Sequence, residues 1–100
     1  MRRFKISLTP KALSDIDKLR FAIVFKYRAP LTAKRYLEGL NNTFQSLKIG
    51  ADSIRVDEEL SRQFGLDMRR VNYKEMAILY SVDEDIVYIH RIMPQSMIIF

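Results

Sequence analysis

Three segments in the last third of the chain alternate apolar and polar residues, and only a few residues separate one segment from the next. They read LDMRRVNY (66–73), EMAILYSV (75–82) and DIVYIHRIM (85–93). A period of two is typical of β-strands, and connections this short allow neighbouring strands to pair only in the antiparallel sense. The sequence therefore predicts a three-stranded antiparallel meander in this part of the chain.

The residues at the start of the chain predict one strand followed by a helix. RFKISL (3–8) alternates with a period of two, Thr9 suits a helix N-cap, and Pro10 suits the first helical position. Apolar residues at three- and four-residue steps then predict a helix over 10–27. Its run FAIVF (21–25) is apolar all round, so we expect that end to be covered on more than one side. The polar side of this helix carries Lys11, Ser14, Asp15, Lys18 and Lys26.

A second helix is predicted over 32–48, with Thr32 as its N-cap and Gly50 at its end. The short connection between the two helices predicts an antiparallel hairpin. Residues 51–66 are polar and are predicted to form a loop with room for a short helical turn. The order strand, helix, helix and three strands predicts one α+β domain over residues 1–100, with the helices packed on one face of a four-stranded sheet.

The composition excludes several kinds of protein and site. The chain has no cysteine and one histidine, so we predict no metal site and no cofactor. No apolar run is long enough for a signal peptide or a membrane span, which predicts a cytoplasmic protein with no membrane partner. The net charge of +5 by itself favours an anionic partner, which could be nucleic acid, a membrane surface or an acidic protein.

Arginines gather on the predicted strands, where they could meet such a partner. A planar guanidinium binds phosphates and carboxylates alike, so nucleic acid and an acidic protein both stay open as partners. After the last strand the segment PQSMIIF (94–100) ends in four large apolar residues, which we expect to dock on the domain or on a partner. The arginines in question are Arg2, Arg3, Arg69, Arg70 and Arg91.

His90 is the candidate for acid–base chemistry. Together with Tyr80, Tyr88 and the arginines, it could supply the groups that cleave RNA through its 2′-hydroxyl. A regular strand would point His90 and Arg91 to opposite faces, which argues against their acting together. A β-bulge would bring both onto one face. His90 and Tyr88 are therefore weak catalytic candidates, and a structural role for His90 stays open.

Three stretches of the chain carry a family resemblance. They are FKISLTPKALSDIDKL (4–19), PLTAKRYLEGL (30–40) and MRRVNYKEMAILYSVDEDIVYIHRIMPQSM (68–97). The most specific pieces are the spacing from Arg70 to ILYSV and the ending IxRIxxQSM. With these stretches the chain resembles, over nearly its whole length, the RelE/ParE superfamily of toxins from type II toxin–antitoxin systems.

The resemblance implies one of two activities. RelE-like members cut messenger RNA on the ribosome, whereas ParE-like members poison DNA gyrase. Ala77 and Pro94 stand where RNases of the family carry an arginine and a histidine, and both departures favour the ParE-like class. Arg70 and Arg91 match arginines of ParE-like sequences.

The resemblance thus implies a ParE-like toxin that inhibits DNA gyrase without being an enzyme. It also implies a cognate acidic antitoxin encoded nearby, which would neutralise the toxin in a hetero-oligomer. One alternative is an endonuclease that acts on messenger RNA at the ribosome, and another is a degenerate member that only binds its antitoxin. The residues expected to bind the target or the antitoxin are Arg69, Arg70, Arg91, Gln95, Ser96 and Met97.

Overall fold

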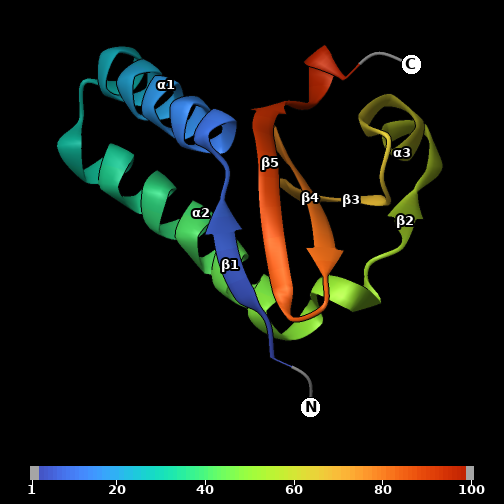
Figure 1. The fold of residues 1–100 in the computed structure, drawn as a ribbon. Helices are drawn as coiled ribbons and strands as arrows, with labels where there is room; N and C mark the ends of the chain where they lie inside the picture. Colours follow the sequence, from blue (N-terminus) through green and yellow to red (C-terminus); the bar gives the residue numbers. More distant parts are fainter. Residues whose placement is uncertain (1–2, 99–100) are drawn as a thin grey trace.

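The computed structural model describes residues 3–98, so Arg2 and the last two residues of the apolar tail, Ile99 and Phe100, lie outside the described residues. The five strands form one sheet in the order β1-β5-β4-β3-β2, which Figure 1 shows with the helices around it. The elements along the chain are β1 (Lys5–Leu8), α1 (Pro10–Tyr27), α2 (Pro30–Gly50), η1 (Ala51–Ser53), β2 (Val56–Asp57), α3 (Glu58–Phe64), β3 (Met68–Tyr73), β4 (Met76–Asp83), β5 (Ile86–Pro94) and η2 (Gln95–Met97).

The predicted meander and the predicted α+β order are confirmed. β3, β4 and β5 pair antiparallel in sequence order. β1 lies parallel to β5, from Lys5 opposite Ile86 to Leu8 opposite Ile89. The two helices between β1 and the meander carry the chain from one edge of the sheet to the other, so β1 can join the sheet beside its last strand.

The helical hairpin covers one face of the sheet, as predicted. Alternate residues of β4 point into this core, and Ile78 and Tyr80 are fully buried there. From α2, a stripe at helical spacing packs against them. Its buried members are Ala33, Tyr36, Leu40, Phe44 and Leu47.

The prediction of a loop over residues 51–66 is wrong in part: the short helical turn that it allowed for is α3, but the segment also holds β2. Asp57 caps α3 by accepting a hydrogen bond of 3.0 Å from the Leu60 amide. Glu58 and Glu59 occupy its first turn, where negative side chains stabilise the helix by interacting with the positive end of its dipole. The acidic residues 57–59, which lie in the predicted loop, therefore form the N-terminus of a helix. α3 packs on the face of the sheet opposite the hairpin, through Leu60 and Phe64.

The second helix begins earlier than predicted, and Thr32 is not its cap. Pro30 is the first helical residue and Ala29, in an extended conformation, is the N-cap without a side-chain hydrogen bond. A proline at the first position already has a helical φ and lacks one of the amides that have no partner within the helix. Thr32 therefore lies inside the first turn. The helix ends at Gly50, as predicted.

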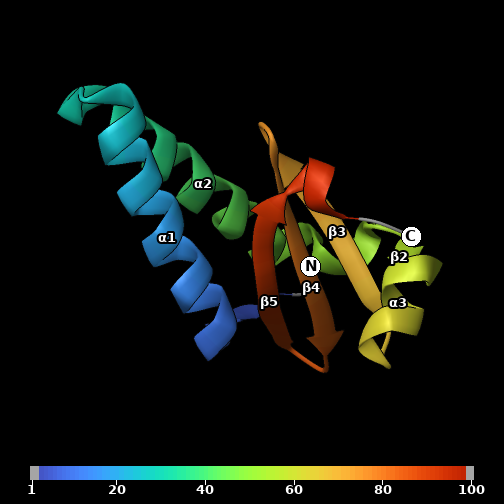
Figure 2. The same cartoon turned by 90° about the horizontal axis from the view of Figure 1, so that it is seen from above.

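The expectation that residues 21–25 are covered on more than one side is also wrong. Only Ile23 is buried, whereas the side chains of Phe21 and Phe25 are 66% and 62% exposed. Figure 2 shows why, since the end of the hairpin extends beyond the strands and has no sheet beneath it. The tip of the hairpin therefore presents an uncovered apolar face. Among the described residues, no helix is both long enough and apolar enough to cross a membrane.

Candidate functional site

A β-bulge in β5 brings His90 and Arg91 onto one face of the sheet. On β4, Leu79 lies opposite Arg91 while the next residue, Tyr80, lies opposite Ile89. His90 is the extra residue between these two pairs, so the alternation of β5 is reversed after it. Arg91 consequently lies on the same face as α3, which we call the α3 face, and His90 points to this face as well.

Arg70 and Arg91 lie in one row across the α3 face. Arg70 of β3 lies opposite Leu79 of β4, and Leu79 lies opposite Arg91 of β5. Two strand spacings separate the backbones of the two arginines, a distance of roughly 10 Å. The apolar Leu79 between them is fully buried. The meander therefore places the two arginines that match the family on the same side of the sheet.

Arg69 lies on the opposite face, under the hairpin. Its guanidinium Nη1 donates hydrogen bonds to the carbonyl oxygens of Ala51, at 3.3 Å, and Ile54, at 3.0 Å. Tyr80 is buried beside it and donates to the same Ala51 carbonyl at 2.8 Å. Burial raises the pKa of Tyr80 to about 12, an effect that the charge of Arg69 partly offsets. The structure thus separates Arg69 and Tyr80 from the other candidate residues.

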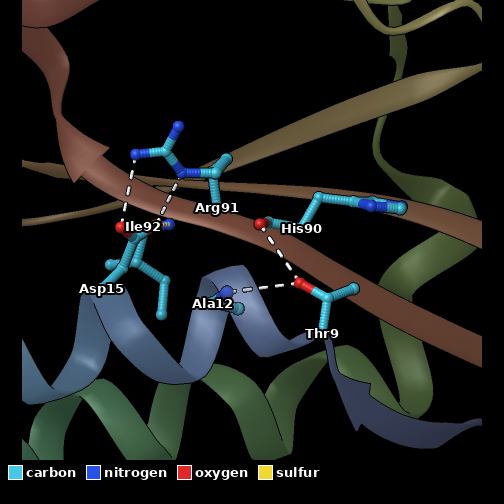
Figure 3. Close-up of polar contacts among 6 residues, drawn as sticks. All are labelled: Thr9, Ala12, Asp15, His90, Arg91 and Ile92. Carbon is cyan, nitrogen blue, oxygen red and sulfur yellow. Dashed lines mark hydrogen bonds and ion pairs between the residues drawn. The ribbon is translucent and has the colours of Figure 1, made fainter.

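Arg91 forms a two-pronged ion pair with Asp15 of α1 (Figure 3). Arg91 Nε lies 2.7 Å from Asp15 Oδ2, and Arg91 Nη2 lies 3.2 Å from Asp15 Oδ1. The hydrogen bonds that Arg91 donates to Asp15 raise the pKa of its guanidinium above the ordinary value of arginine. Sequence reasoning placed Asp15 on the polar side of the helix, but its side chain is only 8% exposed. It was the functional candidate that the sequence missed.

Asp15 and Thr9 also bind the backbone of β5 where β1 has ended. The Thr9 amide donates to the carbonyl of Ile89 at 3.2 Å, and the Thr9 hydroxyl donates to the carbonyl of His90 at 3.3 Å. Asp15 Oδ2 accepts a hydrogen bond of 3.0 Å from the buried Ile92 amide. The same Thr9 hydroxyl accepts from the Ala12 amide as the N-cap of α1. The first turns of α1 therefore continue the hydrogen bonding of the sheet edge.

Gln95 links Arg70 to the end of the chain. Its Oε1 accepts a hydrogen bond of 3.3 Å from Arg70 Nη2, and its Nε2 donates to the Lys74 carbonyl at 2.7 Å. Arg70 Nε donates to Asn72 at 2.9 Å. Gln95 opens η2, which also contains the exposed residues Ser96 and Met97. Arg70 and the QSM ending therefore meet, although 25 residues separate Arg70 from Gln95.

Two apolar pockets flank Arg91. One, of about 220 Å³, lies between α3 and the sheet, with Leu60, Phe64 and Leu79 in its wall. The other, of about 340 Å³, lies between α1 and the end of β5 and is walled by Leu19 and Pro94. Both pockets share three residues. These are Arg91, Met93 and Met97.

His90 points away from Arg91 in Figure 3 and has a different set of contacts. Its Nε2 and Ser81 Oγ share a hydrogen bond of 2.7 Å, and its ring centroid lies 6.1 Å from that of Phe64 and 6.5 Å from that of Tyr88. Burial lowers the pKa of His90 below its ordinary 6.5. Within residues 3–98, no group of histidine, cysteine and acidic side chains is arranged to hold a metal ion.

The fold itself is that of a known toxin–antitoxin structure. A solved structure described as the chromosomal ParDE TA system from P. aeruginosa aligns with a TM-score of 0.74 over 92% of this chain and 96% of that chain. The two sequences are 18% identical, so the alignment establishes a shared fold. A comparison with curated proteins gives no match.

The sequence itself establishes the family. Residues 6–99 match the family described as the ParE toxin of type II toxin–antitoxin system, parDE. Because this match covers nearly the whole chain, the protein belongs to the ParE toxin family.

We expect acid to destabilise the protein through His90. Because burial lowers its pKa, the folded protein favours the neutral imidazole, and the unfolded chain binds more protons below pH 6.5. The neutral His90 therefore makes its full contribution to the free energy of unfolding above pH 6.5. This contribution is lost as the pH falls through the lowered pKa of the folded state. In His90→Gln, urea unfolding midpoints should fall less between pH 7.5 and pH 5 than in the wild type.

His90 is the single histidine of the chain, so the difference between the two proteins isolates its titration. Parallel losses of stability in the wild type and in His90→Gln would contradict this assignment.

Proposed function

We propose that this ParE-family toxin inhibits DNA gyrase by binding it, without cutting nucleic acid. In this proposal the contact is made by the C-terminal surface, which we define as Arg70, Arg91, Gln95 and Met97. Such a toxin acts in the cytoplasm, where gyrase works. The proposal joins the family membership of the chain to the chemistry of this surface.

The observation that carries the proposal is the position of Arg91 between two apolar pockets. Protein interfaces concentrate their binding energy in arginine and large apolar side chains that fill or border such pockets. Met97 is 62% exposed and lines both pockets beside Arg91. Arg70 adds a second guanidinium in the same row of the sheet. A surface of this kind suits a protein target.

The positions of the RNase-type residues also favour binding over cleavage. Ala77, where RNases of the family carry an arginine, is fully buried beneath α3. An arginine could not be accommodated there without displacing the helix. His90 is bonded to Ser81 and points away from Arg91. The arginines and the histidine therefore do not converge on one point where a phosphate could react.

The purified protein should inhibit gyrase supercoiling of relaxed plasmid and leave messenger RNA intact on translating ribosomes. Arg70→Gln should raise the concentration needed for half-inhibition about 10-fold, because it removes a charge-assisted hydrogen bond of about 1.5 kcal/mol. Arg20→Gln is the matched control, since Arg20 forms an exposed ion pair with Asp17 on α1. It removes the same charge and should inhibit as the wild type does.

Cleavage of ribosome-bound messenger RNA together with undisturbed supercoiling would contradict the proposal and favour the endonuclease. Inhibition of neither process would favour a member that only binds its antitoxin.

We also propose that an acidic segment of the cognate antitoxin docks on the uncovered face of the hairpin and forms a hetero-oligomer. The face offers Phe21, Val24, Phe25 and Leu31, each more than half exposed. This part of the hairpin carries more basic than acidic residues, so an amphipathic segment with acidic residues complements both its apolar surface and its charge. The basic residues of this part of the hairpin are Lys18, Arg20, Lys26, Arg28, Lys34 and Arg35, against the acidic Asp17 and Glu38.

Binding of the protein encoded by the adjacent reading frame should test this surface. Its association rate should fall about 10-fold between roughly 50 and 500 mM salt, because screening weakens the attraction between unlike charges. Phe25→Ala should weaken the complex, whereas Leu66→Ala, an exposed apolar residue outside the hairpin, should not. A rate that does not change with salt, or an unaltered affinity in Phe25→Ala, would count against the docking site.

A further inference from the structure

We infer that Asp15 is a positioning residue that holds the Arg91 guanidinium in the orientation in which it meets the target. The inference rests on the proposed function, because the target contact of Arg91 belongs to that proposal. It extends the site to a residue of α1 that is too buried to contact a partner itself, with 8% of its side chain exposed.

The Asp15 carboxylate is fixed by three hydrogen bonds. Two come from the guanidinium of Arg91, at 2.7 and 3.2 Å, and the third comes from the backbone amide of Ile92, at 3.0 Å. Because the third donor belongs to the strand that carries Arg91, the carboxylate cannot rotate without breaking a bond to β5. The guanidinium therefore packs against a rigid counterpart.

This pairing decides which donors Arg91 can offer to a partner. Nε and one hydrogen of Nη2 are used by Asp15, whereas Nη1 has no acceptor within the described part of the chain. The negative charge of Asp15 balances the positive charge of Arg91. The Arg91 side chain nevertheless remains 31% exposed. Arg91 is thus a directional donor in a neutral pair, which suits an uncharged acceptor such as a peptide carbonyl better than a phosphate.

The position of Arg91 explains why it needs this support. β1 pairs with β5 only as far as Ile89, and the bulge at His90 comes directly before Arg91. A long side chain at such an edge would sample many rotamers and would lose that freedom on binding. Asp15 restricts the side chain before the target arrives, and a preorganised donor binds more tightly.

Asp15→Asn tests the inference, because the amide oxygen can still accept from Ile92 while the charge is removed. In NMR spectra, the Arg91 Nε–H signal should lose part of its protection from exchange, because the amide group replaces the oxygen that accepts from Nη2 and the two-pronged pair is broken. Half-inhibition of gyrase should require roughly 10-fold more protein, and inhibition should become more sensitive to salt, since Arg91 is then an unpaired cation. Asp17→Asn, the same change at an exposed position two residues away, is the control and should match the wild type.

A double variant separates positioning from a general loss of structure. If Asp15 acts through Arg91, Asp15→Asn combined with Arg91→Gln should inhibit no more weakly than Arg91→Gln alone. Additive losses would overturn the inference. Full inhibition by Asp15→Asn, beside a loss in Arg91→Gln, would overturn it too.

Arg91→Lys decides the question if Asp15→Asn fails to fold. Lysine keeps the charge beside Asp15 but lacks the planar fork, so inhibition should fall, and undiminished inhibition would overturn the inference. A wild-type protein that leaves supercoiling untouched would refute the proposed function and the inference with it. The Arg91 Nε–H signal distinguishes that result from a failure of Asp15 to hold Arg91.

Discussion

The structure depends on how β5 is held where its neighbour β1 ends. Beyond Ile89 this edge of β5 has no strand beside it, and a buried amide left without an acceptor costs about 1–3 kcal/mol. Thr9, the N-cap of α1, and Asp15 of α1 supply the missing partners for the His90 carbonyl and the Ile92 amide. β5 can therefore continue to Pro94, and the carboxylate that satisfies Ile92 also holds Arg91 between the two apolar pockets.

Most of the fold could be predicted from the sequence because its elements have strong periodicities. The alternation of β4 and the helical spacing of α2 both reflect burial on one side. The sequence gives no comparable signal for α3, whose seven residues are capped by an aspartate that is equally common in loops. The bulge at His90 leaves only a weak signal, because it changes a single step of the strand, from two residues to the three between the buried Ile89 and Ile92.

The candidate site could be predicted only in part, for the same reason. Arg69 and Arg70 are adjacent on a strand, so alternation alone places them on opposite faces, and the structure does so. A signal for Asp15 existed in its helical spacing from the buried Ala12 and from Leu19, which packs against the core. The partner of Asp15 could not be predicted, because Arg91 is 76 residues away and points to its side of the strand only because of the bulge.

Amide hydrogen exchange at Ile92 tests most directly whether Asp15 replaces a strand at this edge. In the wild type the Ile92 amide should be as well protected as that of Ile78, its partner on β4. In Asp15→Ala it should exchange at least about 10-fold faster relative to Ile78, because a locally open amide exchanges without global unfolding. Equal protection of the two amides in Asp15→Ala, or an unprotected Ile92 in the wild type, would contradict the account.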